Sequence, residues 1–536
     1  MPRQGSGSAA WPRWLAGGAV AILLAIVLAA HAVTQYIDQD EEYYVAAAYL
    51  AQSTTLYRDF IFFQPPIYPI ILSELFAVTD GASKFLVARL MSAFLAVGAI
   101  AAFYSIARGV SGHVGAAAVC TSLFASSPVM LRPFGSTRND VMPVFFGLCG
   151  VALLLAGLRS EGARRWVASL TCGICLALAG GTKLSAGFLI PATLLYVAVR
   201  ERHSPALRRL APLAIGIAIG ALPTFVFAIV DWERFRYSVF TFHVTGAAEY
   251  YGPSESEYFT LHRATWEMAS AVAQEPALIG AVLFLVLVLA LAPHPRRYHQ
   301  IVPELRERDG ILPLILAAMA IPFVLLPRPF GLPYLVPLVP YLLLSCACAY
   351  PLAAKFLSRT QLRLVAAAAG AVVAAEAGRL ASEVPRAVDP SRWTVTQVNE
   401  LATLVHRAVA RRGGGPVATL YPLLVLDAGG EIYPEFATGI YFIRSATRMP
   451  DDRVLQLHGA SPGTLAIIFA AVPPAAVLVG DTAVERPLQD WAARNCYTED
   501  SEALSRWRGG PYDIRPEDTW RPRLLVQQPR TQDCDR

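Results

Sequence analysis

The chain has 536 residues, of which 55% are hydrophobic and only 16% are charged. Soluble domains carry about 25% charged residues, so this composition excludes a chain that folds entirely in water. The mean hydropathy of +0.44 fits a membrane protein, provided that the apolar residues come in runs of about 20. The formal net charge of +5 does not indicate nucleic-acid binding, because the positive residues lie in short loops between apolar runs.

Eleven apolar runs are long enough, or nearly long enough, to cross a bilayer. The first follows a polar segment containing Arg3 and Arg13 and lacks a small-residue cleavage site, so we interpret it as a retained helix rather than a signal peptide. The sequence therefore predicts an α-helical polytopic membrane protein with about eleven transmembrane helices within residues 1–381. The runs cover residues 14–36, 84–107, 113–131, 140–158, 166–182, 184–200, 210–231, 272–292, 311–327, 332–354 and 361–380.

Lys and Arg residues are distributed unevenly between alternate loops. Seventeen of them fall in the N-terminal segment and the loops on its side of the membrane, against eight in the loops on the other side. Positive residues in short loops mark the inner side of a membrane. We therefore expect a multi-pass protein of the bacterial cytoplasmic (inner) membrane with its N-terminus inside, and an odd number of spans places the C-terminal part outside.

From about Ser382 the composition becomes that of a soluble domain. Residues 417–426 and 475–479 are predicted to be strands, and residues 483–495 an amphipathic helix, so residues 382–536 are predicted to form an extracytoplasmic α/β domain. Cys496 and Cys534 would face an oxidising compartment there. The sequence leaves open whether they form a disulfide or remain free thiols.

The first outer loop, residues 37–83, begins with four acids, Asp38, Asp40, Glu41 and Glu42. Acids at a membrane surface are costly when buried and are mostly retained there for function. The alternative is that they favour the positive end of a helix that opens at this point. A second amphipathic stretch begins at the Pro-Pro pair and runs to about residue 78, so we expect two interfacial helices beneath the acidic loop.

Cations and histidines on the outer side have both structural and functional interpretations. Arg89 lies about one turn below the membrane surface, where an arginine either reaches to the interface or binds an anionic headgroup. Lys183, between two apolar runs, has the same two interpretations. His243 and His262 lie in an aromatic outer loop over residues 232–271 and could contact an acceptor, but their spacing does not resemble a metal site.

Several motifs occur in the order found in one enzyme family. Asp40-Glu41 is followed by Tyr44, by an aromatic stretch that leads to Gln64 and the Pro-Pro pair, and by Val-Ala-Arg-Leu at residues 87–90. This pattern resembles the N-terminal signature of the GT-C glycosyltransferases, in particular family 39, which includes bacterial aminoarabinose transferases and protein O-mannosyltransferases. Three further features agree with it, Arg138-Asn139-Asp140, Thr182-Lys183 and residues 334–340, so the resemblance covers about residues 30–355.

The resemblance implies a GT-C-like transmembrane domain and a definite reaction. Members of the family transfer a sugar from a polyprenyl-phosphate donor to a hydroxyl at the outer face of the membrane, and attack from the back of the anomeric carbon inverts it. The acceptor can be a glycan, a lipid or a protein. The resemblance implies catalytic roles for Asp40, Glu41 and Asp140, and substrate contacts from Tyr44, Arg58, Gln64, Arg89, Arg138 and Lys183.

One position departs from the family pattern. Many relatives have a Lys before the Pro-Pro pair that reaches the donor phosphate, whereas this chain has the neutral Gln64. Either Arg58 or Lys183 replaces that Lys, or the donor differs. A monophosphate donor requires no cofactor, although an acidic loop is also compatible with a divalent metal ion. A transporter or flippase of a lipid-linked or small-molecule substrate is the alternative function, but such proteins usually bind near the bilayer midplane.

Overall fold

The computed structural model describes residues 13–200, 206–246, 261–290, 309–325, 331–507, 512–515 and 518–527. Each of the eleven apolar runs coincides with a helix in this part of the chain. Six helices are long and apolar enough to cross a membrane, and up to nine spans result if each of three bent helix pairs counts as one. The helices are α1 (Arg13–Thr34), α4 (Lys84–Ser111), α5 (Val114–Ser126) with α6 (Pro128–Gly135), α7 (Val141–Leu158), α8 (Gly162–Thr182), η1 (Leu184–Phe188) with α9 (Leu189–Arg200), α10 (Ala206–Val230), α14 (Pro276–Ala290), α16 (Ile311–Leu325), α17 (Val339–Phe356) and α18 (Arg359–Ala381).

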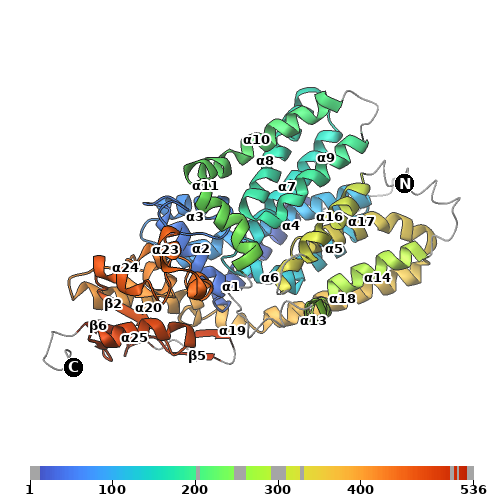
Figure 1. The fold of residues 1–536 in the computed structure, drawn as a ribbon. Helices are drawn as coiled ribbons and strands as arrows, with labels where there is room; N and C mark the ends of the chain where they lie inside the picture. Colours follow the sequence, from blue (N-terminus) through green and yellow to red (C-terminus); the bar gives the residue numbers. More distant parts are fainter. Residues whose placement is uncertain are drawn as a thin grey trace, which may run out of the picture.

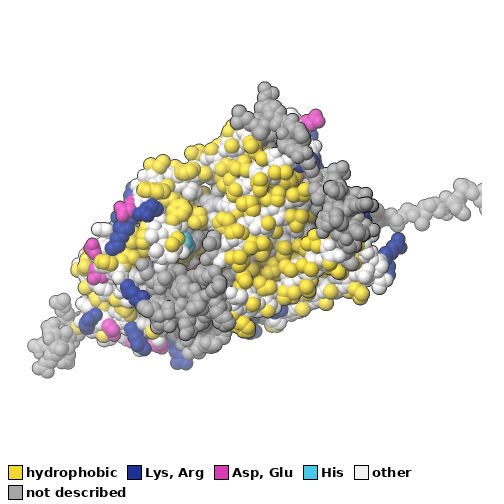
Figure 2. All heavy atoms as spheres, turned by 45° about the vertical axis from the view of Figure 1, so that its right-hand side comes forward, with side chains coloured by type: hydrophobic (Ala, Val, Ile, Leu, Met, Phe, Trp, Pro, Cys, Tyr) yellow, Lys and Arg dark blue, Asp and Glu magenta, His cyan; other side chains and the backbone are white. Residues whose placement is uncertain are grey.

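The helices form a bundle with a broad hydrophobic surface (Figures 1 and 2). Figure 2 shows this surface as a wide band over the helical part, with charged side chains gathered towards the two ends of the molecule. Two helices cross especially closely: a Cβ on Gly173 of α8 would lie 2.2 Å from the Leu213 carbonyl oxygen, and one on Gly216 of α10 would lie 2.0 Å from that of Leu170. Small residues at such crossings let membrane helices pack backbone to backbone.

Two helices cover one end of the bundle, as the acidic loop predicts. Helix α2 (Gln39–Leu50) turns by 98° from α1, and α3 (Ile67–Val78) follows the Pro-Pro pair. Helix α3 ends at Val78, where the predicted amphipathic stretch ends. Both helices lie next to the C-terminal region in Figure 1. Further along the chain, α11 (Trp232–Arg236), the π-helix η2 (Tyr237–Gly246) and α13 (Leu261–Ala273) follow α10.

The C-terminal region begins where α18 ends and contains a four-stranded sheet with the order β1-β2-β6-β3. Strands β1 and β2 are parallel, while β6 runs antiparallel to both β2 and β3. The strands are β1 (Val417–Thr419), β2 (Ala476–Val479), β3 (Tyr497–Glu499) and β6 (Arg523–Gln527), with a separate hairpin of β4 (Tyr512–Arg515) and β5 (Asp518–Trp520). The helices include α19 (Val384–Ala387), α20 (Thr394–Ala410), α21 (Leu423–Leu426), α22 (Ile440–Ser445), α23 (Asp451–Gln456), α24 (Leu465–Ala471) and α25 (Arg486–Arg494).

One predicted strand is only partly correct. Strand β1 ends at Thr419, and Leu423–Leu426 form the short helix α21 instead of the rest of a strand. Pro422 lies at the helix N-cap, and proline cannot donate to a strand ladder but is compatible with the start of a helix. The predicted strand at 475–479 and the predicted helix at 483–495 are confirmed by β2 and by η8 (Ala483–Glu485) with α25. Cys496 is disulfide-bonded, and Cys534 lies outside the described residues.

The C-terminal region is held against the bundle by polar contacts. The Asp427 carboxylate accepts hydrogen bonds from the Phe85 N–H at 2.8 Å and from the Ser83 hydroxyl at 3.0 Å, so it caps the N-terminus of α4. A carboxylate at a helix N-terminus interacts favourably with the helix dipole. The Thr394 hydroxyl donates to the Thr34 carbonyl oxygen at the end of α1. These contacts join the C-terminal region to α1 and α4.

Candidate active site

The acidic loop folds into the N-terminus of α2, where Asp38 and Asp40 share the partner Arg138, while Glu41 and Glu42 have other partners. Asp38 is the N-cap residue: its side chain accepts from the Asp40 N–H, and Glu41 accepts from the Asp38 N–H at 2.9 Å, which completes a capping box. The predicted capping role is therefore present. Because successive residues of a helix point about 100° apart, Glu41 and Glu42 reach partners other than the one that Asp38 and Asp40 share.

Glu41 is paired with Arg89 in the interior of the protein. Both side chains have no exposed surface, and the Arg89 guanidinium donates to the two Glu41 oxygens at 3.0 and 2.7 Å. Its remaining N–H groups donate to the carbonyl oxygens of Ala32, Gln35 and Tyr36, at and just beyond the end of α1. An arginine has five N–H donors, and all five are satisfied here. Arg89 therefore ties α1, α2 and α4 together, and the substrate contact that the resemblance implies for it stays a prediction.

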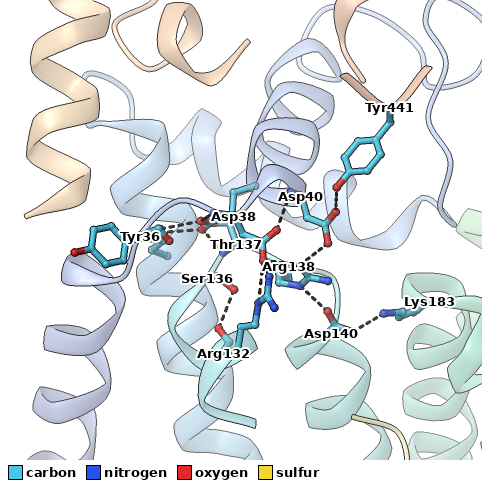
Figure 3. Close-up of polar contacts among 12 residues, drawn as sticks. Tyr36, Asp38, Asp40, Arg132, Ser136, Thr137, Arg138, Asp140, Lys183 and Tyr441 are labelled. Carbon is cyan, nitrogen blue, oxygen red and sulfur yellow. Dashed lines mark hydrogen bonds and ion pairs between the residues drawn. The ribbon is translucent and has the colours of Figure 1, made fainter. Parts of the chain in front are cut away.

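Asp38 and Asp40 belong to a second cluster centred on Arg138 (Figure 3). One terminal nitrogen of Arg138 lies 2.7 Å from an oxygen of Asp38 and 2.5 Å from an oxygen of Asp40. Its Nε donates to Asp140 at 3.0 Å. Arg138 therefore bridges three carboxylates from two segments, and Figure 3 shows it between Asp40 and Asp140.

Two more cations complete the cluster. The Lys183 ammonium donates to the second oxygen of Asp140, and Arg132 pairs with Asp38 at 2.5 Å. Asp140 is buried with 1% of its side chain exposed, whereas Lys183 is 16% and Arg132 45% exposed. The described side chains thus place three carboxylates and three cations together, so their formal charges cancel. A substrate anion would reach Lys183 or Arg132 before it reached Arg138.

Asp40 is the most accessible acid of the cluster. Its side chain is 22% exposed, compared with 11% for Asp38 and 1% for Asp140. Burial raises the pKa of Asp40 above its ordinary value, an effect that the Arg138 charge opposes and that Asp38 reinforces. For Asp38, burial acts in the same direction, but Arg138 and Arg132 outweigh it and lower the pKa. Two carboxylates two residues apart therefore differ in proton affinity, and Asp40 is the one that binds a proton more readily.

Other sequence-predicted residues fall into two groups. Tyr44 is buried next to the cluster, with its ring against Tyr68 at 5.2 Å. Gln64 accepts a hydrogen bond from the Asn139 amide at 3.2 Å, and the same amide donates to the Thr182 carbonyl oxygen at 3.3 Å. Gln64 thus lies one hydrogen-bonded residue away from the segment that carries Lys183. Arg58 does not join the cluster through any described contact: it pairs with its neighbour Asp59 at 2.9 Å, and its side chain is 56% exposed.

A small cleft is lined at one point by the Asp140–Lys183 pair. Apart from these two residues, its lining is almost entirely apolar, and it runs between α7, η1 and the residues leading into α17. A charged pair and apolar walls suit a ligand with a phosphate headgroup and a hydrocarbon chain. Lining residues include Val144, Phe188, Leu189, Val336, Pro337 and Pro340.

Among the described residues, no group of three or more His, Cys, Asp and Glu side chains is arranged to hold a metal ion. The Arg138 guanidinium, rather than open space, lies between the three carboxylates. The His243 side chain is exposed and its ring nitrogen bonds the Phe63 carbonyl oxygen at 2.6 Å, while the His262 side chain lies outside the described part of the chain.

Residues 14–243 match the model of the dolichyl-phosphate-mannose-protein mannosyltransferase family. The fold is similar to the crystal structure of ArnT from Cupriavidus metallidurans bound to undecaprenyl phosphate, with a TM-score of 0.59, 14% sequence identity, and coverage of 97% of this chain and 99% of that one. The apo form of the same enzyme gives a TM-score of 0.60 at 13% identity, covering 97% of this chain and 100% of that one. The chain has a GT-C glycosyltransferase fold. The predicted GT-C-like glycosyltransferase of many membrane helices is thereby confirmed.

A more distant similarity agrees with this fold. An oligosaccharyltransferase from Archaeoglobus fulgidus, in a crystal structure with zinc and sulfate, has a TM-score of 0.50 at 14% identity, covering 86% of this chain and 67% of that one. No curated protein matches the chain by sequence.

Sequence reasoning missed three members of the GT-C transferase's acidic cluster. The sequence marks Asp38 as an acid of the loop but does not indicate that Asp38 pairs with Arg138 or that Arg132 belongs to the site. No sequence pattern indicates a role for Tyr441, although its hydroxyl donates a hydrogen bond to Asp40. It lies 401 residues further along the chain, where only the packing of the C-terminal region can bring it to the site.

Proposed function

We propose that this protein transfers a sugar from a polyprenyl-phosphate donor to an acceptor hydroxyl at the outer face of the bacterial cytoplasmic membrane, with inversion. The observation that carries the proposal is the position of Asp40. It is the most accessible acid of a buried ionic cluster, and the same cluster includes Lys183, which lines a mainly apolar cleft. The candidate base Asp40 and the candidate phosphate-binding cation Lys183 therefore belong to the same ionic cluster.

In the proposed reaction, the acceptor oxygen attacks the anomeric carbon as Asp40 takes the hydroxyl proton. The new bond is between the acceptor oxygen and the anomeric carbon, and the bond that breaks joins that carbon to the phosphate oxygen. The electron pair leaves with the polyprenyl phosphate. Its growing negative charge requires cations rather than an acid, and Lys183 and Arg138 are within the same cluster.

The donor assignment rests on two kinds of support. The cleft that Lys183 lines has the chemistry of a lipid phosphate site, and a structurally similar enzyme, ArnT, has been crystallised with undecaprenyl phosphate. Lys183 is also the cation nearest to Gln64 along the Asn139 hydrogen bonds, so we propose that it replaces the Lys that many relatives have before the Pro-Pro pair. Glu41 and Arg89 are proposed to hold the site together without touching substrate.

The orientation follows from the same reasoning. The acidic cluster, α2, α3 and the C-terminal region lie at one end of the bundle, and the loop charges of the sequence assign that end to the outside. We therefore propose an inner N-terminus and an outer domain formed by residues 382–536. The acceptor, whether a glycan, a lipid or a protein, is the other substrate at this face.

The test is genetic complementation read by mass spectrometry of envelope glycans, lipids and proteins. A deletion strain should lose one sugar addition, which the wild-type gene restores. Asp40→Asn should insert normally, bind undecaprenyl phosphate and yet fail to restore the addition. The matched control is Asp80→Asn, an exposed acid of the same loop, which should restore it fully. Restoration by Asp40→Asn would exclude Asp40 as the base.

A further inference from the structure

The carboxylate of Asp40 is held from two sides by residues that are far apart in the sequence. One oxygen lies 2.5 Å from the Arg138 guanidinium, and the other accepts a hydrogen bond from the Tyr441 hydroxyl. Arg138 belongs to the membrane bundle, whereas Tyr441 lies on α22 in the C-terminal region. In Figure 3 the Tyr441 ring approaches Asp40 from the side opposite to Arg138 and Asp140.

The position of Tyr441 depends on how the segment that leads to α22 is held against α2. Glu42, on α2, accepts a hydrogen bond from the Leu423 N–H at 2.7 Å, which fixes the segment that begins near Leu420. Gly439, the residue before α22, has a φ of +55°, and a Cβ there would lie 2.8 Å from the Leu420 carbonyl oxygen. Only glycine fits this turn easily, and the turn starts α22 directly beside α2.

Aromatic contacts hold α22 against α2 and against the loop before α3. The Tyr441 ring meets the edge of the Tyr43 ring at 6.0 Å, and Phe442 packs against Phe63 at 5.8 Å. Aromatic pairs at these distances contribute beyond their buried area. The ring of Tyr441 is thus placed by packing, which leaves its hydroxyl to act on Asp40.

We propose that Tyr441 is a positioning residue that keeps the Asp40 carboxylate ionised and fixes its plane, so that the C-terminal region completes the active site. The role of the carboxylate as a base rests on the proposed function. A phenol that donates to a carboxylate stabilises the charged form. With Tyr441 on one oxygen and Arg138 on the other, the carboxylate cannot rotate, so its remaining lone pairs keep one direction.

This hydrogen bond matters because the surroundings of Asp40 oppose its charge. Burial and the neighbouring carboxylates favour the protonated form, while Arg138 and Tyr441 favour the ionised form. A protonated Asp40 cannot accept the proton of an attacking hydroxyl. The titratable and charged groups described around Asp40 are Asp38, Asp140, Arg138, Tyr43, Tyr44, Tyr334 and Tyr441.

The alternative is that Tyr441 only helps to dock the C-terminal region. Tyr441→Phe separates the two roles, because it keeps the ring and its packing and removes only the hydroxyl. A matched control exists in the same region: Tyr433 donates its hydroxyl to the Val472 carbonyl oxygen at 2.7 Å and packs against Phe469, with no contact to Asp40 among those described. Tyr433→Phe therefore removes a phenol hydrogen bond of similar geometry at a distance from the site.

The test is infrared titration of the full-length protein in lipid nanodiscs. The protonated carboxyl band of Asp40 is identified by its loss in Asp40→Asn, and its pKa is read from the pH dependence of that band. Tyr441→Phe should raise this pKa by about one unit, the shift expected when a carboxylate loses one donor. Tyr433→Phe should leave it unchanged. An Asp40 titration in Tyr441→Phe that overlays the wild type, or moves to lower pH, overturns the proposal.

Because this readout needs no sugar donor, it separates the two proposals. If deletion of the gene removes no sugar addition, the proposed function fails, whereas a raised Asp40 pKa in Tyr441→Phe would still stand. Where transfer is measured, Tyr441→Phe should shift the acidic limb of the pH profile of kcat/KM to higher pH by the same amount. At pH values above that limb, the variant should keep most of the wild-type kcat/KM. A uniform loss of kcat/KM at all pH values would indicate docking instead.

Discussion

Replacing Arg89 by methionine tests whether the buried pair with Glu41 is structural. The methionine retains an apolar side chain in the space of the arginine stem, so little cavity is created. The variant leaves the Glu41 carboxylate without its counter-ion and removes the donors to three carbonyl oxygens at the end of α1. Breaking a buried ion pair by removing one partner costs about 3–5 kcal/mol. We expect a loss of that size in the free energy of unfolding.

The assay is denaturant titration of the purified protein in mixed micelles, with helix content as the signal. Arg108→Met is the matched control, because Arg108 lies on the same helix, α4, with an exposed side chain, and surface substitutions usually change stability by less than ~0.5 kcal/mol. The double variant Arg89→Met/Glu41→Leu should lose less than the two single variants added together, since it leaves no unpaired charge. If Arg89→Met unfolds like Arg108→Met and loses only undecaprenyl phosphate binding, Arg89 is a donor ligand and our reasoning is refuted.

Three further predictions concern the site and the docking of the C-terminal region. The rate of sugar transfer should decrease as the pH is lowered, with a midpoint above the ordinary aspartate pKa of 3.8, because the base must be ionised and burial raises the pKa of Asp40. A rate that stays constant through pH 3.8 would contradict this prediction. Lys183→Met should weaken binding of undecaprenyl phosphate, measured by native mass spectrometry, by roughly tenfold to a hundredfold, since a hydrogen bond to a charged group contributes about 1.5–3 kcal/mol; unchanged binding would remove Lys183 from the donor site. Gly439→Ala should destabilise the docked C-terminal region by about 1–3 kcal/mol, the cost of a strained backbone position, seen as faster proteolysis within residues 382–507; equal proteolysis rates would show that the turn tolerates a side chain.

Local sequence patterns predicted the helices and the acidic helix start because both depend on neighbouring residues. Apolar runs and the Pro-Pro pair fix where helices such as α3 begin and end, and a cap such as Asp38 acts within three residues. The prediction of a strand over residues 417–426 was partly wrong for a related reason. A continuous apolar run shows neither helical nor strand periodicity, so only Pro422 could have indicated the change to a helix. Neighbouring residues alone are therefore sufficient to predict helix ends and helix caps, but not the state of a short apolar run.

The partners of the acids could not be predicted in the same way. The sequence places Asp40 next to Glu41, but only tertiary packing sends Glu41 to Arg89 in the interior and Asp40 to Arg138 and Tyr441 at the surface of the cluster. The one-residue difference rotates the side chain by about 100° around α2. An acid pair that looks like one motif in the sequence is therefore divided between a structural pair and an accessible carboxylate.

The charge balance of the cluster links the two halves of the proposed reaction. Asp38, Asp40 and Asp140 are matched by Arg132, Arg138 and Lys183, so a resting site has no excess positive charge for a phosphate. When Asp40 accepts the acceptor proton, it becomes neutral and the cluster gains a net positive charge. That charge develops at Arg138, which bridges to Asp140 and hence to Lys183, at the moment when the leaving phosphate becomes more negative. Proton transfer at one end of the cluster therefore stabilises the leaving group at the other, and a single ionic network can serve both steps.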